Sequence, residues 1–138
     1  MHELCLMLTR SDRAMRAVVS SKLGKQRLTM MEWLALGVVA RGGKEGLSMT
    51  RIANSLDVTL PQVTALVTGL LERKFIKQKV LSSDHRGRQV MITLKGKRVL
   101  GKLETAIASS IRTLAKDVPS RRWQAYIRTV EQLSAQAD

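Results

Sequence analysis

Two arginines that flank a glycine, Arg86-Gly87-Arg88, are the residues of this sequence whose spacing most directly suggests chemistry. Asp84 stands two residues before Arg86 and can form an ion pair with either arginine, which would stiffen the segment but add little stability at an exposed site. A guanidinium group is attracted into the narrow minor groove of A·T-rich DNA. We therefore favour a nucleic-acid contact for Arg86 over a solvated arginine, whereas Arg88 can serve either as a contact or as the partner of Asp84.

The other reactive side chains predict no catalytic or metal site. Cys5 is the single cysteine, so no disulfide can form within the chain. It has no evident donors or cations nearby to activate its thiol, and we expect a buried structural cysteine rather than a redox-active one. His2 lies at the terminus and His85 beside the arginines, so neither is expected to share a metal with Cys5.

Enzyme motifs are missing from the sequence. It contains no Ser/His/Asp set, no glycine-rich phosphate loop before a helix and no pair of histidines at helical spacing. Asp84 and Arg86 have no base or nucleophile near them in the sequence. We therefore expect a protein that is not an enzyme and needs no cofactor.

Charge is the strongest global feature of the chain. It has 24 Lys and Arg against 11 Asp and Glu in 138 residues, and residues 41–102 hold 13 of the bases but only 4 of the acids. A concentrated positive field points first to nucleic acid and second to an anionic membrane surface, although a generally basic, solvated surface would give the same totals. Only 3% of the residues are aromatic, which disfavours binding of single strands by stacking. No segment is apolar enough to span a membrane or resembles a secretory signal, and we expect a cytoplasmic protein.

The elements that would position these residues are mostly helical. Gly24 is expected to stop a first helix, and the capping box Thr29–Glu32 to open a second helix that runs to about Ala40. Ser48 can cap a short third helix, and after a turn a second capping box begins at Thr59. The helix that follows buries one apolar stripe, which consists of Val63, Leu66, Val67, Leu70 and Leu71.

The opposite face of that fourth helix carries Gln62, Thr64, Ala65 and Thr68, which are small or polar and uncharged. A face with no role beyond solvation usually carries Lys and Glu, so this one is suited to approach another surface closely. Gln can pair with adenine, and threonine methyl groups can pack on thymine. We expect these four residues to face DNA.

A hairpin and two further helices complete the pattern. Residues 75–81 and 89–92 are predicted strands, which places Arg86 at the tip of a hairpin. Arg51 in the third helix, Lys74 before the first strand, and Lys77 and Lys79 within it are expected to contact phosphates only in part, some of them being simply solvated. A long helix should run from Thr93 to about Lys116, and a last helix follows Pro119. A helix-turn-helix followed directly by a charged hairpin is a winged helix-turn-helix.

Several short motifs in this order resemble the MarR family of bacterial transcription regulators, over nearly the whole chain. They are Leu28-Thr29, Leu47-Ser48, Arg51-Ile52-Ala53, Val63-Thr64, Leu66-Val67, the Asp84-x-Arg86 pair and residues 90–96, VMITLKG. The recognition helix of the family commonly carries arginine near the positions of Ala65 and Gly69 here. This sequence lacks those charges, so base recognition would depend on Gln62, Thr64 and Thr68.

The resemblance implies a mainly α, single-domain protein that works as a homodimer. Residues 1–27 and 100–138 would form the dimerisation helices, and residues 28–99 the DNA-binding lobe with its small antiparallel wing. The terminal helices alone cannot form the two packed layers that a core requires, so a second copy would cover their apolar side chains. The expected dimerisation residues are Leu4, Leu8, Met15, Trp123, Ile127 and Val130.

The function implied is a regulator, most simply a repressor, that binds a pseudo-palindromic site in double-stranded DNA. The recognition helix would enter the major groove and the wing arginine the adjacent minor groove. Members of the family often hold a small-molecule effector in a cleft between the dimer helices and the DNA-binding lobe; Trp33 could line that cleft, but a core position is favoured. Two alternatives remain: an architectural DNA-binding protein of low specificity, and a module whose basic hairpin docks an acidic protein.

Overall fold

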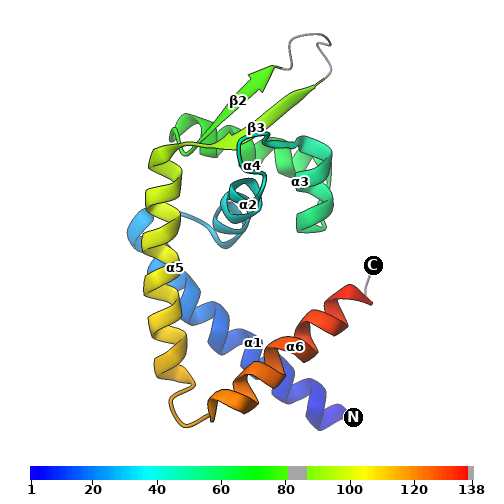
Figure 1. Ribbon diagram of the computed structural model, residues 1–138. Coiled ribbons are helices and arrows are strands. Elements are labelled where there is room, and N and C mark those ends of the chain that lie inside the picture. Colours follow the sequence, from blue (N-terminus) through cyan, green and yellow to red (C-terminus); the bar gives the residue numbers. More distant parts are fainter. Residues whose placement is uncertain (81–86, 137–138) are drawn as a thin grey trace.

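The structure, a computed structural model, describes residues 1–80 and 87–136 and has the predicted order of elements (Figure 1). Its helices are α1 (His2–Leu23), α2 (Met30–Arg41), α3 (Met49–Leu56), α4 (Leu60–Glu72), α5 (Leu94–Leu114) and α6 (Ser120–Ala135). Its strands are β1 (Leu47–Ser48), β2 (Ile76–Val80) and β3 (Arg88–Ile92). The predicted fold class, a mainly helical winged helix-turn-helix with a small antiparallel sheet, is confirmed.

Side-chain caps begin three of the helices at the predicted residues. The Thr29 hydroxyl accepts from the Glu32 N–H while the Glu32 carboxylate accepts from the Thr29 N–H, as a capping box requires. Ser48 caps α3 and Thr93 caps α5 by the same kind of bond to the third residue of the helix. The end of α1 differs from expectation: Gly24 continues into a short 3-10 turn, and the left-handed residue that redirects the chain is Arg27.

The wing is a three-stranded sheet in the order β1-β3-β2, with both pairings antiparallel. The short strand β1, formed by Leu47 and Ser48 before α3, was not predicted because two residues carry no periodicity. It pairs with Val90 and Gln89, which fastens the start of the helix-turn-helix to the sheet.

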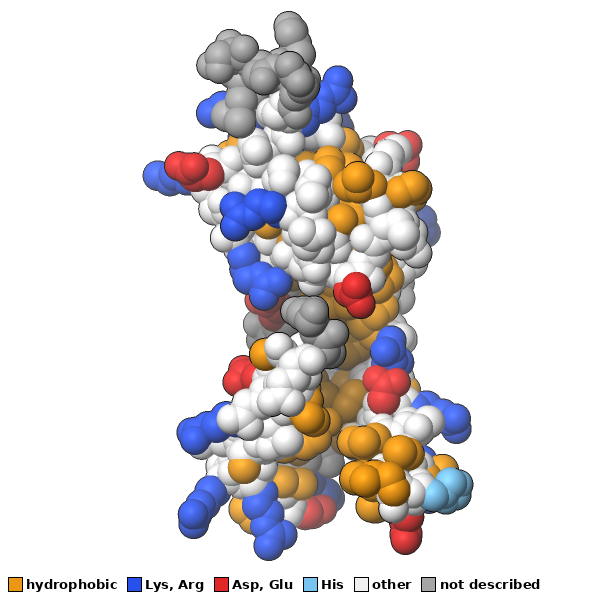
Figure 2. Space-filling model, turned by 90° about the vertical axis from the view of Figure 1, so that its right-hand side faces the viewer, with side chains coloured by type: hydrophobic (Ala, Val, Ile, Leu, Met, Phe, Trp, Pro, Cys, Tyr) orange, Lys and Arg blue, Asp and Glu red, His pale blue; other side chains and the backbone are white. Residues whose placement is uncertain are grey.

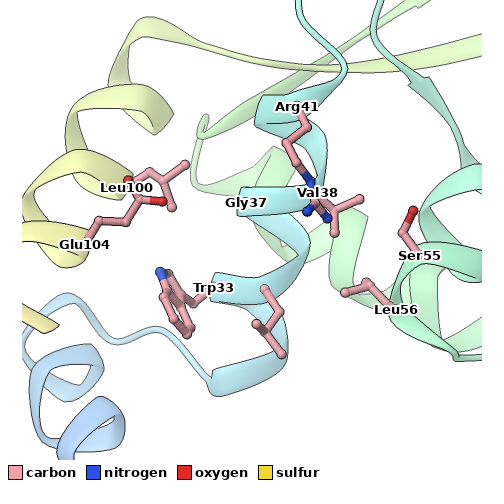
Figure 3. Close-up of a pocket in the computed structure, with 9 residues that line it drawn as sticks. Trp33, Gly37, Val38, Arg41, Ser55, Leu56, Leu100 and Glu104 are labelled. Atoms are coloured by element: carbon pink, nitrogen blue, oxygen red, sulfur yellow. The ribbon is translucent and has the colours of Figure 1, made fainter. Parts of the chain in front are cut away.

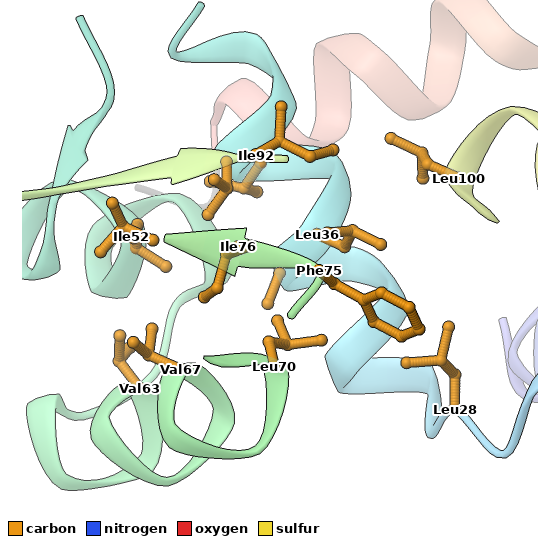
Figure 4. Close-up of a cluster of buried hydrophobic side chains, with 14 of the residues drawn as sticks. Leu28, Leu36, Ile52, Val63, Val67, Leu70, Phe75, Ile76, Ile92 and Leu100 are labelled. Atoms are coloured by element: carbon orange, nitrogen blue, oxygen red, sulfur yellow. The ribbon is translucent and has the colours of Figure 1, made fainter. Parts of the chain in front are cut away.

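The core lies where the helix-turn-helix meets the sheet (Figure 4). Val63, Val67 and Leu70 of α4 are buried against the strands, where Ile76 and Ile92 face each other across the sheet. Leu36 of α2 is also fully buried in this cluster. This packing fixes the orientation of α4, so the residues on its opposite face have a defined position relative to the wing.

The terminal helices extend away from this core. The long helix α5 runs from the sheet to the far end of the molecule, where the chain turns into α6, and α6 crosses α1 (Figure 1). No residue of α6 is buried, although Trp123 and Tyr126 stack with ring centroids 5.6 Å apart. A helix of this length normally buries one face, and α6 has no such face within the part of the chain that the structure describes.

None of the helices in the described part of the chain is long and apolar enough to cross a membrane.

Candidate nucleic-acid interface

Four exposed residues of α4 form a continuous surface, which we call the recognition face: Gln62, Thr64, Ala65 and Thr68. The buried residues Val63, Val67 and Leu70 hold the opposite side of the helix against the core. The four residues therefore lie at the surface, where the sequence pattern predicts them. None of them carries a charge, so this face can approach a polyanion without repulsion but cannot attract it.

The hydroxyl groups of the recognition face are already used within the helix. Thr64 Oγ1 donates to the Leu60 carbonyl oxygen over 2.9 Å, and Thr68 Oγ1 donates to the Thr64 carbonyl oxygen over 2.8 Å. Each threonine consequently offers a methyl group and oxygen lone pairs to an approaching surface, but no free donor.

Gln62 is held by the capping interaction that starts α4. Its Oε1 accepts from both the Thr59 N–H and the Thr59 hydroxyl, each over 2.9 Å. The sequence pattern suggested both the capping box and a Gln62–adenine pair, yet both need the same oxygen atom. In this structure the helix cap uses it.

The predicted phosphate contacts surround the recognition face from α3 and the sheet. Arg51, Lys77, Lys79 and Arg88 are all exposed. Lys77 pairs with Met91 and Lys79 with Gln89, so the two lysines share one face of the sheet. Arg88 lies on the other face, the one that also carries the buried Val90. The strand therefore presents positive charge to both sides of the wing.

Two predicted wing residues, Asp84 and Arg86, lie outside the described residues. Within the described segments the only ion pair joins Arg16 and Asp12, with an N···O distance of 2.8 Å. Carboxylates thus leave most of the described positive charge unneutralised, as a surface for a polyanion requires.

Part of the positive charge serves the fold, which sequence reasoning did not identify. The Arg73 guanidinium donates to the carbonyl oxygens of Arg27 and Gln26 and lies 4.7 Å from the ring centroid of Phe75. Lys95 Nζ donates to the Arg73 carbonyl oxygen over 2.9 Å and approaches the same ring. These contacts join segments up to 47 residues apart, and no local motif could have revealed them.

The predicted dimerisation residues gather along an open groove of about 490 Å³ between α1 and α6. Figure 2 shows hydrophobic side chains along the hollow between these two helices, with Lys and Arg around its outer edges. Leu4 is also exposed on α1 but does not line the groove. The other five predicted residues do: Leu8, Met15, Trp123, Ile127 and Val130.

A second cavity, of about 390 Å³, lies between α2, α3 and α5 (Figure 3). Trp33 lines it and also packs partly against the core, so both interpretations of this residue hold in part. The indole N–H of Trp33 is buried without a hydrogen-bond partner among the described residues. Arg41 and Glu104 are the charged residues that line the cavity.

Cys5 is exposed on α1, so the expectation of a buried cysteine is wrong for the single chain. Its neighbours along the helix, Leu4 and Leu8, are exposed as well. The reason is that this end of α1 projects beyond the core, toward the crossing with α6 (Figure 1).

A family model described as MarR family matches residues 28–88, the segment from just before α2 to the first residue of β3. A transcriptional regulator of the MarR family from Rhodococcus sp. RHA1 has a similar structure, with a TM-score of 0.84 at 17% identity. The superposition covers 96% of this chain and 93% of that one.

Two structures with bound molecules are also similar. The S. aureus MepR–DNA complex has a TM-score of 0.78 at 21% identity and covers 95% of this chain and 96% of that one. CouR from Rhodococcus jostii RHA1, bound to p-coumaroyl-CoA, has a TM-score of 0.81 at 19% identity and covers 94% and 90% of the two chains. At these identities the likeness concerns the fold.

Proposed function

We propose that this chain, which belongs to the MarR family of winged helix-turn-helix transcription regulators, is a homodimeric repressor that occupies a pseudo-palindromic site in double-stranded DNA. The family is one of regulators and not of enzymes. The observation that carries the proposal is the uncharged recognition face of α4. The core holds this face between exposed basic side chains of α3 and of the wing. The DNA-bound structure of MepR, which shares this fold, supports the same use of it.

In this proposal α4 enters the major groove, whose width admits one helix. The basic side chains of α3 and the wing contact phosphates. These contacts provide affinity but carry no information about the DNA sequence. Since Lys77 and Lys79 lie on one face of the sheet and Arg88 on the other, the wing can reach phosphates on either side of a groove.

The homodimer is supported by the groove between α1 and α6. A second copy would cover its apolar walls and give α6 the buried face that it lacks in the single chain. Two-fold symmetry would then place two copies of α4 about one turn of DNA apart, roughly 10 base pairs. The preferred DNA site should accordingly be an inverted repeat.

In vitro selection of duplexes from a random pool tests this function. The proposal predicts enrichment of an inverted repeat against scrambled competitor DNA. The lack of any charged base-reading residue on the recognition face favours a second candidate, an architectural protein of low specificity, for which selection would yield no consensus. Absence of affinity for any duplex at moderate salt would instead favour an acidic protein as the partner.

Lys77→Ala should weaken binding to all DNA sequences alike. If Lys77 neutralises one phosphate, its loss should make the negative slope of the logarithm of the binding constant against the logarithm of the salt concentration shallower by about 0.9. Fluorescence anisotropy titrations at several salt concentrations measure this slope. Lys116→Ala is the matched control, because Lys116 is exposed beyond the far end of α5, away from the wing. Equal slopes for Lys77→Ala and the control would show that Lys77 does not contact a phosphate.

We further propose that the cavity beside Trp33 holds a small-molecule effector. Its apolar walls suit an apolar body, and the unpartnered indole N–H suits a hydrogen-bond acceptor near α5, on the side that Figure 3 shows it facing. The cavity lies between α5 and the helix-turn-helix, so an occupant could change the distance between the two α4 helices. The structure of CouR with p-coumaroyl-CoA supports effector binding in a protein of this fold.

Trp33→Phe tests the effector site, because it keeps an aromatic ring and removes only the indole N–H donor. In a thermal-shift panel of aromatic carboxylates, any compound that stabilises the protein should bind the variant roughly fivefold more weakly, as expected for one lost hydrogen bond. Trp123→Phe, a second tryptophan outside the cavity, should leave that affinity unchanged. A panel that stabilises both variants equally would contradict the site.

A further inference from the structure

The donors and acceptors left free on the recognition face are unusually few, and they restrict which bases it can recognise. Thr64 and Thr68 donate their hydroxyl protons to carbonyl oxygens one turn earlier in α4. Ala65 has only a methyl group. Three of the four side chains on this face therefore present methyl groups, together with two threonine oxygens that can accept but not donate.

The remaining residue, Gln62, can donate but not accept. The backbone N–H of Thr59 is necessarily a donor, so the Gln62 atom that it contacts must be the oxygen, which fixes the orientation of the amide. That oxygen also accepts from the Thr59 hydroxyl, so both of its lone pairs are in use. Only the two N–H groups of the amide stay available for DNA.

From these bonds we infer that the recognition face reads thymine methyl groups, and that Gln62 donates one-way to an acceptor on a base edge. The inference rests on the proposed function. Methyl groups of Thr64, Ala65 and Thr68 complement the 5-methyl group of thymine, the one apolar feature of the major groove. The amide of Gln62 can donate to purine N7, guanine O6 or thymine O4. It does not form the bidentate pair with adenine, because that pair needs a free Oε1.

The adenine pair is disfavoured for an energetic reason as well. To accept from the adenine amino group, Gln62 would have to release Thr59 and give up its half of the capping box that starts α4. Loss of a helix cap destabilises a helix by an amount similar to one hydrogen bond, so the exchange brings little net gain. We therefore expect Gln62 only to donate a hydrogen bond to the DNA, rather than to form the bidentate pair with adenine that its residue type suggests.

Base analogues test the inference with the protein unchanged. On the duplex obtained by selection, replacing single thymines with deoxyuridine removes only a methyl group. We expect at least one position in each half-site to lose about fourfold in affinity, the effect of one buried methyl group. Where Gln62 donates to purine N7, the 7-deaza analogue of that purine should also weaken binding, whereas removing the amino group of an adenine should not.

Thr64→Ser supplies the matched protein variant, since serine keeps the hydroxyl and loses the methyl group. Its affinity should fall on the thymine duplex, yet equal that of the unmodified protein on the matching deoxyuridine duplex. Thr105→Ser, whose hydroxyl makes the same bond to the Gly101 carbonyl oxygen in α5, should change neither. Thr68→Ser serves in the same way should Thr64→Ser alter the helix.

The outcomes separate the inference from the function beneath it. If the selected duplex binds and no deoxyuridine substitution weakens it, the methyl reading is wrong while the proposed function stands. If removal of an adenine amino group and 7-deaza substitution of the same adenine both weaken binding, Gln62 forms the bidentate pair with adenine after all. If no duplex binds, the proposed function fails and the inference with it.

Discussion

Ile127→Glu should convert the protein into a monomer and lower its affinity for an inverted-repeat duplex by roughly 100-fold. Ile127 lines the groove between α1 and α6 and is 41% exposed in the single chain, so a second copy can cover the rest of it. A carboxylate at this position would be buried in the dimer without a partner. The free energy needed to bury this unpaired charge exceeds the free energy gained by forming the interface. Loss of the second half-site then removes the gain in effective concentration that a dimer provides.

Sedimentation velocity measures the mass of the variant, and fluorescence anisotropy its affinity for DNA. Gln132→Glu is the control, since it adds the same charge on the opposite face of α6, away from the residues that line the groove. It should remain dimeric and bind DNA as before. A tight dimer of Ile127→Glu would show that α1 and α6 do not form the interface.

Gly96→Ala should lower the free energy of unfolding by about 3 kcal/mol, the upper end for overpacking a core. Gly96 is buried in the first turn of α5, where a Cβ atom would overlap the Phe75 carbonyl oxygen and approach Ile92 Cγ1 to 2.9 Å. The neighbouring backbone cannot yield easily, because the same carbonyl oxygen accepts from the Thr93 N–H and the Thr93 hydroxyl. The variant would therefore disturb the junction between α5 and the wing.

Urea denaturation followed by circular dichroism measures this change. Gly101→Ala is the control in the same helix, since a Cβ atom there meets nothing within 4 Å. It should raise the free energy of unfolding by about 0.5–1 kcal/mol, because alanine favours the helix more than glycine does. Equal effects of the two substitutions would mean that the close approach at Gly96 is absent.

The local elements of this fold were predictable because their determinants are local. Thr29, Ser48 and Thr93 start helices through bonds to residues three positions later, and such motifs are visible in the sequence. The apolar stripe of α4 likewise has a period that only a helix satisfies. The order of these elements along the chain was then sufficient to predict the winged helix-turn-helix fold.

Long-range contacts were not predictable from one sequence. Arg73 holds the end of the α1–α2 connection against Phe75, a role that its residue type does not indicate. Lys74 occupies a left-handed conformation, with φ of 60°, which glycine adopts more readily than lysine. Only the path of the chain shows that these positions serve the fold.

The candidate site was partly predictable. Residue type and helical spacing placed the recognition face at the surface, but they could not decide between the two uses of the Gln62 oxygen. The hydrogen bonds decide it in favour of the cap. The groove contains five of the six predicted dimerisation residues because α1 and α6 cross, an arrangement that the period of each helix alone does not determine.

Sedimentation velocity of the unmodified protein, alone and with its selected duplex, tests the central proposal most directly. We expect a free species of twice the 15.4 kDa chain mass, and a complex that holds two chains on one inverted-repeat duplex. A free species of one chain mass, or a duplex that sediments unchanged in low salt, would contradict it.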